Sequence, residues 1–179
     1  LRTCGQEGLA ALIPGLDPEL EPVSELSAEL RAAGCIPVCS APAVNRLLRN
    51  KLACAQYFEA LHLPFARTVP LARAAELLDD FGFPLLAKPV DGSASRGVCV
   101  VFHRADLADL EQNGTAYVVQ NYLLPVTWGK RKRDLRPADV YRNHALLQTD
   151  EHVVQVLIDQ NHEVIGVFTS SNTLKDGAV

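Results

Sequence analysis

The sequence lacks methionine altogether, and aromatic residues make up only 6% of its 179 residues. No apolar run approaches the roughly 20 residues that cross a bilayer, which excludes a membrane-spanning protein. The first residues also lack the apolar stretch of a secretory signal. Because even position 1 is not methionine and the chain stops at Gly177-Ala178-Val179, we expect a piece of a longer protein or a chain with residues missing.

The charge balance argues against a protein that binds nucleic acid through its overall charge. The chain has 17 basic and 21 acidic residues, a net charge of −4, so bulk attraction to nucleic acid is not expected. Apolar residues make up 48% and charged residues 21%, which is typical of a globular protein. The length suits one domain or two small lobes joined by a hinge.

Metal-binding patterns are also missing. The five cysteines include no C-x-x-C pair, and the histidines are scattered, so we do not expect a zinc site. The favoured interpretation of the cysteines is that they are small buried apolar side chains in a reducing cytoplasm. We therefore expect a cytoplasmic protein.

Hydrophobic periodicity indicates alternating strands and helices. A strand over 9–14, a helix over 17–33 and a strand over 35–39 follow the pattern of a parallel sheet. Beyond them we expect helices over 43–61, 72–81 and 105–112, and strands over 83–89, 98–102, 117–122, 153–158 and 164–168. Residues 125–150 have no clear period and are interpreted as a long loop or insertion. The fold class is thus mixed, α/β followed by α+β.

The segment 88–98, with sequence KPVDGSASRGV, carries the strongest chemical signal. Glycine and serine let backbone N–H groups converge on phosphate oxygens, and Lys88 adds a positive charge at the base of the hairpin. The segment is neither a Walker A loop nor a Rossmann G-x-G-x-x-G. A flexible hairpin with a surface lysine stays open as an alternative, although a lysine in a half-buried strand needs a partner.

Motifs in order along residues 9–168 resemble the ATP-grasp ligases, and among them most closely proteins similar to the large subunit of carbamoyl-phosphate synthase. The motifs are LIP at 12–14 with DPEL at 17–20, NK at 50–51, LP at 63–64 with Thr68, FPLLAKP at 83–89 with GSAS at 92–95, VQNYL at 119–123, and 151–157 with Asp159.

The resemblance implies a division of the chain. Residues 1–45 correspond to the end of a Rossmann-like pre-ATP-grasp domain, 46–119 to a linker helix and the small lid lobe, and 120–179 to the start of the large lobe. The two lobes of the ATP-grasp fold would grip ATP between them.

The resemblance also implies roles for single residues. Lys51 and Lys88 would be the catalytic residues that contact the ATP phosphates, Lys88 lying also near the adenine edge. Backbone amides of the loop would cover the β- and γ-phosphates, Gln120 would meet the adenine amino group, and Glu151 would bind the ribose hydroxyls. The full set of cofactor-binding residues is Lys51, Lys88, Gly92, Ser93, Ala94, Ser95, Gly97, Gln120, Asn121, Tyr122, Leu123 and Glu151.

The chain departs from the family pattern at several places. Gln120 stands where glutamate is common, Gln155 where aspartate is common, and residues 125–150 replace a short turn. Residues 169–173, with Lys175 just after them, occupy a place that is commonly basic. The family's Mg²⁺ ligands come later than residue 179, so no metal ligand is assigned within the chain. The basic run at 130–133 is interpreted as a solvated loop, or as a loop that closes over the triphosphate or an acidic substrate.

The resemblance therefore implies an ATP-dependent ligase with ATP and Mg²⁺ as cofactors. It would activate a small carboxylate-bearing substrate as an acyl phosphate, which an amine, ammonia or a thiol then attacks to form a C–N or C–S bond. A non-catalytic ATP-binding module is the alternative. We expect neither membrane nor nucleic acid as partner, and leave a homodimer open.

Overall fold

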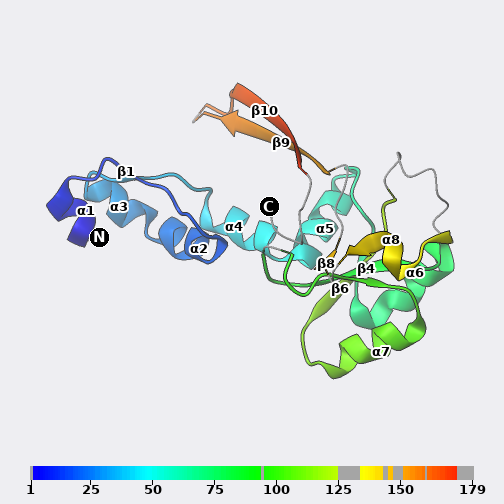
Figure 1. Ribbon diagram of the computed structural model, residues 1–179. Coiled ribbons are helices and arrows are strands. Elements are labelled where there is room, and N and C mark those ends of the chain that lie inside the picture. Colours follow the sequence, from blue (N-terminus) through cyan, green and yellow to red (C-terminus); the bar gives the residue numbers. More distant parts are fainter. Residues whose placement is uncertain are drawn as a thin grey trace. The chain divides into compact units, whose positions relative to one another are not determined.

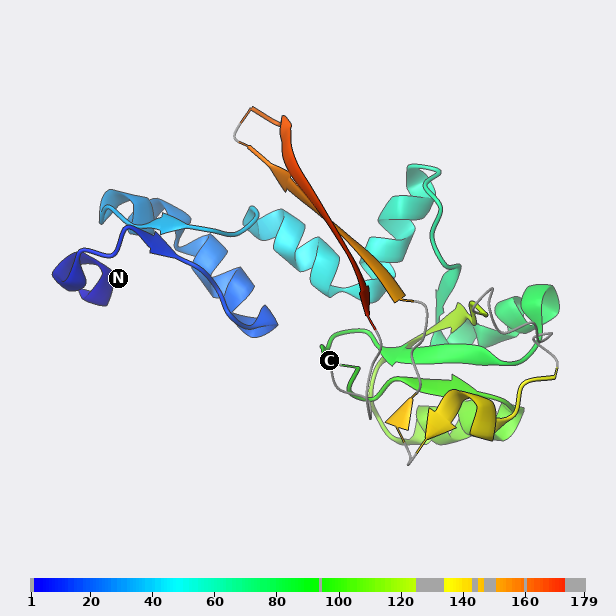
Figure 2. The ribbon, with the colours of Figure 1, turned by 45° about the horizontal axis from the view of Figure 1, so that its top comes forward.

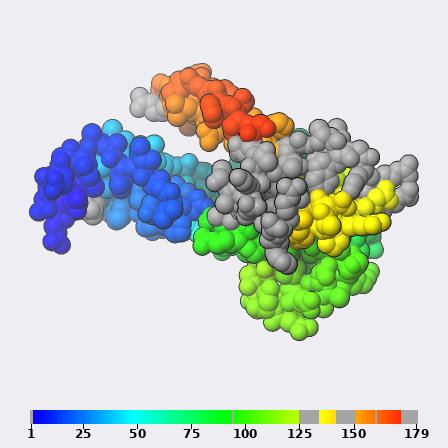
Figure 3. All heavy atoms as spheres, in the orientation of Figure 1, coloured from blue at the N-terminus to red at the C-terminus, as the bar shows by residue number. Residues whose placement is uncertain are grey.

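The computed structural model of the chain describes residues 2–93, 95–124, 134–142, 145–146, 151–159 and 161–172. Two compact units are distinguished, Leu1–Phe65 with Val90–Ser93 and Ala66–Pro89 with Ala94–Val179, and each is described by itself. The elements are labelled in Figure 1, the ribbon is turned in Figure 2, and all heavy atoms are drawn in Figure 3. The domain boundaries expected after residues 45 and 119 come from the resemblance and stay predictions.

The described elements follow the chain in this order: α1 Arg2–Glu7, β1 Ala11–Leu12, α2 Asp17–Glu25, α3 Ser27–Ala32, β2 Ile36–Pro37, α4 Pro42–Arg49, α5 Lys51–Ala60, β3 Thr68–Pro70, the 3₁₀ turn η1 Leu71–Arg73, α6 Ala74–Phe81, β4 Leu85–Pro89, β5 Cys99–Val101, α7 Arg104–Gln112, β6 Tyr117–Asn121, α8 Pro137–Val140, β7 Tyr141–Arg142, β8 Ala145–Leu146, β9 Glu151–Ile158 and β10 Val164–Asn172.

The first unit contains a short parallel sheet. Strand β1 pairs with β2 in parallel, with α2 and α3 between them in the chain, so the predicted strand–helix–strand pattern is confirmed. The helix predicted over 17–33 is in fact two helices that meet at Leu26. Helix α2 continues through Pro22, which has no backbone N–H, as far as Glu25, and the break follows at Leu26. Cys4 and Cys35 are buried together with Leu30, as expected for cysteines that act as small apolar side chains.

The helix predicted over 43–61 is also interrupted. Helix α4 ends before Asn50, and the Asn50 side-chain oxygen accepts hydrogen bonds from the backbone N–H groups of Leu52 and Ala53 at 3.1 and 3.0 Å. An asparagine that caps two orphan amides favours the start of a new helix over the interior of a long one. Lys51 is therefore the first residue of α5.

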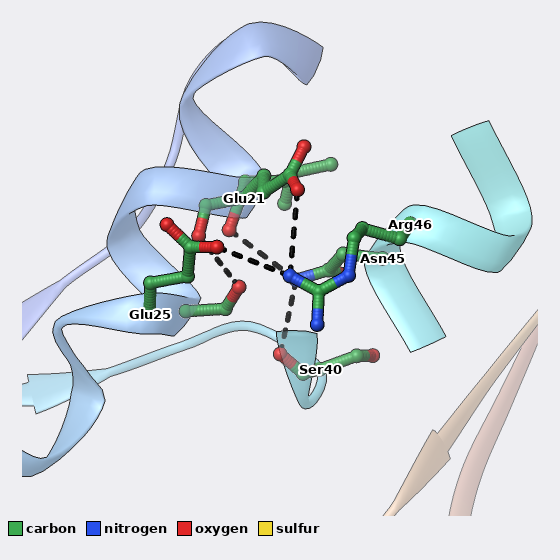
Figure 4. A network of polar contacts seen from close by, with 7 residues as sticks. Glu21, Glu25, Ser40, Asn45 and Arg46 are labelled. Atoms are coloured by element: carbon green, nitrogen blue, oxygen red, sulfur yellow. Dashed lines mark hydrogen bonds and ion pairs between the residues drawn. The ribbon is translucent and has the colours of Figure 1, made fainter. Parts of the chain in front are cut away.

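Figure 4 shows how α4 is held against α2. The buried Asn45 amide donates to the carbonyl oxygens of Leu20 and Ser40 at 3.3 and 3.0 Å. The neighbouring Arg46 forms ion pairs with Glu21 and Glu25 on α2. Both ion pairs are exposed and contribute little, about 0–1 kcal/mol each. The buried amide is therefore the stronger constraint on this helix pair.

The second unit is built on a four-stranded sheet with the order β3-β6-β4-β5, in which every pairing is antiparallel. The predicted strands β4, β5 and β6 are confirmed. Strand β3 was not predicted, because three residues are too few to show a period of two. Helices α6 and α7 cover one face of the sheet, as Figure 1 shows. On that face Leu77 of α6 and Leu110 of α7 join the core with Leu85, Val101 and Val119.

Part of the segment predicted as a long loop is regular. Residues 134–142 contain α8 and β7, and β7 pairs with β8. The hydroxyl of Tyr141 accepts a hydrogen bond from the backbone N–H of Val100 on the edge strand β5, at 2.6 Å. This segment therefore occupies an edge amide that would otherwise lack a partner. Residues 125–133, including the basic run, and 143–144 and 147–150 lie outside the described residues.

Strands β9 and β10 form the predicted hairpin, which is orange to red in Figure 3. Its turn is organised by Asp159, whose carboxylate accepts from the backbone N–H groups of Glu163 and Asn161 at 2.9 and 2.8 Å. These bonds lower the pKa of Asp159, the bond from Glu163 most of all. Among the residues with a described structure, no helix is long and apolar enough to cross a membrane.

Candidate nucleotide site

The candidate phosphate loop leaves the sheet directly after Lys88 and Pro89 at the end of β4 and returns as β5. Ser95 and Gly97 have positive φ angles of 55° and 72°. Residues near left-handed conformations turn successive backbone N–H groups into a concave anion site. Of the predicted loop residues, Gly92 and Ser93 belong to the first unit and Ser95 and Gly97 to the second, while Ala94 lies outside the described residues.

The register of the sheet places Lys88 and Gln120 on the same face. Lys88 lies opposite Val118, and Gln120 lies two residues further along β6, opposite Leu86. Residues that face each other in an antiparallel pair point to the same side, and side chains alternate along each strand. The helix-covered core takes the alternate residues of both strands, including Leu85, Ala87 and Val119. Lys88 and Gln120 are thus diagonal neighbours on the face turned away from α6 and α7.

Gln120 is held in place by a short chain of hydrogen bonds. Its side-chain nitrogen donates to the hydroxyl of Thr68 at 2.7 Å, and that hydroxyl donates to the carbonyl of Ala66 at 2.8 Å. Thr68 is the register partner of Gln120 across β3 and β6. Only 6% of Gln120 is exposed, so its amide must be hydrogen-bonded within the fold or by a ligand.

Lys51 contacts the loop backbone within the first unit. The ammonium of Lys51 donates to the carbonyl oxygen of Gly92 at 2.9 Å. The backbone N–H of Lys51 donates to the carbonyl oxygen of Val90 at 3.1 Å. The structure therefore brings together two of the predicted site residues, Lys51 and Gly92. Within the first unit the ammonium of Lys51 is thus held at the backbone of Gly92.

The segment after Gln120 is the predicted hinge. The backbone N–H of Asn121 donates to the backbone carbonyl oxygen of Arg67 at 3.3 Å. The buried side-chain oxygen of Asn121 has no hydrogen-bond partner among the described residues. Burial raises the pKa of Tyr122, and the nearby Tyr141 raises it further. Leu123 is exposed. Glu151 is half-buried at the start of β9, opposite Asn172, in the hairpin and not in the four-stranded sheet.

Within the described part of the chain, no group of three or more His, Cys, Asp or Glu side chains is arranged to hold a metal ion.

The sequence did not predict that Thr68 would be the hydrogen-bond partner of Gln120. The β-branched pair Thr68 and Val69 was the available signal for a strand at that point.

Solved structures share this architecture. N5-carboxyaminoimidazole ribonucleotide synthetase from Thermus thermophilus matches 96% of the chain with a TM-score of 0.60 and 17% identity. Carboxyaminoimidazole ribonucleotide synthase from Aspergillus clavatus, complexed with ATP, matches 87% of it with a TM-score of 0.56 and 15% identity. Both are ATP-grasp proteins. The chain has the ATP-grasp fold.

A third ATP-grasp structure comes from another enzyme. The biotin carboxylase domain of Hydrogenobacter thermophilus 2-oxoglutarate carboxylase, solved with MgADP, ADP and bicarbonate, matches 68% of the chain with a TM-score of 0.55 and 16% identity. The chain spans 40%, 36% and 30% of the three matched chains, in the order given, and is thus a fragment of the fold that they contain. No protein-family model and no curated protein matches it.

Proposed function

We propose that the chain supplies the nucleotide-binding part of an ATP-dependent ligase. The enzyme passes the γ-phosphate of ATP to a carboxylate, and an amine, ammonia or a thiol attacks the resulting acyl phosphate. The sequence resemblance favours a protein similar to the large subunit of carbamoyl-phosphate synthase. In this proposal residues 46–119 are the linker helix and lid lobe, and 120–179 begin the large lobe.

The observation that carries the proposal is the shared face of Lys88 and Gln120. An ammonium group and a buried amide lie as diagonal neighbours on one face of a sheet whose β4–β5 connection is the glycine- and serine-rich loop. The ammonium suits a phosphate, the amide suits a base edge, and the loop amides suit further phosphate oxygens. These are the parts that phosphoryl transfer requires for positioning and charge neutralisation.

The solved structures support ATP as the nucleotide that this site binds. Two of the matched structures are complexes with ATP and with MgADP on the same fold. Magnesium, when bound, neutralises charge on the β- and γ-phosphates. The chain's own contribution is to bind and orient the nucleotide through Lys51, Lys88 and the loop, and its described residues supply no cluster for the metal.

The test is thermal unfolding of the full-length protein that contains this chain, with and without Mg-ATP. Ligand at 100 times its dissociation constant adds about 2.7 kcal/mol of stability, which is a shift of roughly 5–10 °C for a chain of this size. Lys88→Ala should abolish most of this shift. Arg104→Ala is the matched control, because it removes an exposed positive charge at the start of α7, on the far side of the sheet.

The outcomes separate the alternatives. A shift that Lys88→Ala removes and Arg104→Ala keeps supports the site. A wild-type protein without any shift refutes both the ligase and the non-catalytic ATP-binding module. If ATP binds, release of ADP in the presence of a carboxylate and ammonia distinguishes the ligase from the module.

A further inference from the structure

We propose that Thr68 is a positioning residue that fixes the amide of Gln120 so that the site accepts adenine and rejects 6-oxopurines. The inference rests on the nucleotide site proposed above. It concerns which of two hydrogen-bonding groups, the amide oxygen or the amide nitrogen, is presented to the base.

The hydrogen-bond chain determines the orientation of the amide. A threonine hydroxyl has one proton, and in this structure that proton is donated to the carbonyl of Ala66. Towards Gln120 the hydroxyl can then only accept, so the NH₂ group of the amide must face Thr68. The oxygen of the amide consequently points away from β3.

Because Thr68 engages the amide nitrogen, the oxygen is the group of the amide that is left for a base edge. Strand β6 lies between β3 and β4, and Lys88 is on β4. The amide nitrogen is directed to the β3 side, which leaves the oxygen for a ligand on the Lys88 side. Because threonine is β-branched, its side chain has few rotamers, and this orientation is well defined.

The chemistry of the purine ring gives the selectivity. Adenine carries an amino donor at position 6, whereas guanine and hypoxanthine carry a carbonyl acceptor there. The amide oxygen of Gln120 pairs with the first and opposes the second. A buried acceptor without a donor costs enough to make the 6-oxopurine nucleotide bind about 10- to 100-fold more weakly. Without Thr68 the amide can rotate by half a turn and present its NH₂ group instead.

The test is a comparison of dissociation constants for ATP and inosine triphosphate, measured by calorimetry on the full-length protein that contains this chain. Wild type should prefer ATP by about 10- to 100-fold. Thr68→Val keeps the branched shape but cannot accept the hydrogen bond, and should reduce the preference to about threefold or less, mainly by improving inosine triphosphate binding. Thr68→Ser keeps the hydroxyl and should restore the preference. Thr115→Val, an exposed threonine of the same unit, is the control and should change nothing.

A second variant keeps the inference testable if Thr68→Val does not fold. Gln120→Glu has no NH₂ group to present, so it should bind inosine triphosphate even more weakly relative to ATP than wild type does. An unselective wild type, or a preference that Thr68→Val leaves unchanged, overturns the role of Thr68 while the nucleotide site stands. A wild type that binds neither nucleotide overturns the proposed function itself.

Discussion

Replacement of Gly97 by alanine tests the packing at the base of the candidate phosphate loop. Gly97 has a φ of +72°, and a Cβ atom at this position would lie 2.9 Å from Cγ of Pro89 and 3.5 Å from the hydroxyl of Tyr117. Gly114 has nearly the same φ, +73°, but a Cβ atom there would meet nothing within 4 Å. Both glycines belong to the second unit. The pair therefore separates the backbone penalty from the steric one.

The two costs can be estimated. A left-handed conformation costs a non-glycine residue about 1–2 kcal/mol, which both alanine variants pay. The gain from restricting the unfolded chain is the same for both and cancels. Contact with a proline ring cannot be relieved by a rotamer change, and overpacking of this kind costs about 1–3 kcal/mol more. We therefore expect Gly114→Ala to destabilise by about 1–2 kcal/mol and Gly97→Ala by about 2–5 kcal/mol.

Urea unfolding followed by circular dichroism measures both variants, with the m-value as a check that the same transition is compared. Pro89→Ala removes the ring carbon that the new Cβ would meet. In that background, Gly97→Ala should cost no more than Gly114→Ala does, which is a double-mutant cycle. Equal destabilisation of the two single variants would refute the reasoning, because the contact with Pro89 would then carry no energy.

Three further changes test other parts of the structure. Asn45→Ala leaves two carbonyls without their donor and should cost about 1–3 kcal/mol in urea unfolding. Tyr141→Phe removes the acceptor from an edge amide of β5, so that amide should exchange hydrogen faster and stability should fall by about 0.5–1.5 kcal/mol. The amides of Glu163 and Asn161 lower the pKa of Asp159, so this stabilisation of the hairpin is present above the ordinary carboxyl pKa and is lost as the pH falls through the lowered value. NMR shifts of the turn in acid should show that loss, and Asp159→Asn should abolish its pH dependence.

The sequence predicted the elements with a clear hydrophobic period and missed those decided by single polar contacts. Short runs of apolar residues next to turn residues identified β4, β5 and β6. The helix over 43–61 was expected to be continuous because its apolar face continues past Asn50. The structure ends it there because the Asn50 side chain satisfies two orphan amides. A cap of this kind competes with helix propensity locally, and periodicity does not reveal it.

The sequence names the candidate site residues one by one, and these roles stay predictions, whereas the geometry of the site could not be derived from the sequence. Lys88 was identified because a lysine in a half-buried strand needs a partner, and the alternation within β4 already gives its side relative to Leu86. No pattern within either strand gives the register between β4 and β6, which are separated by a loop, another strand and a helix. A shift of that register by one residue would turn Gln120 to the helix-covered face. The observed pairing of Lys88 with Val118 puts both side chains on one face, and the three-residue strand β3 adds the threonine that orients the amide. The chemistry of the site therefore depends on register, which is a property of the packed sheet and of its apolar core.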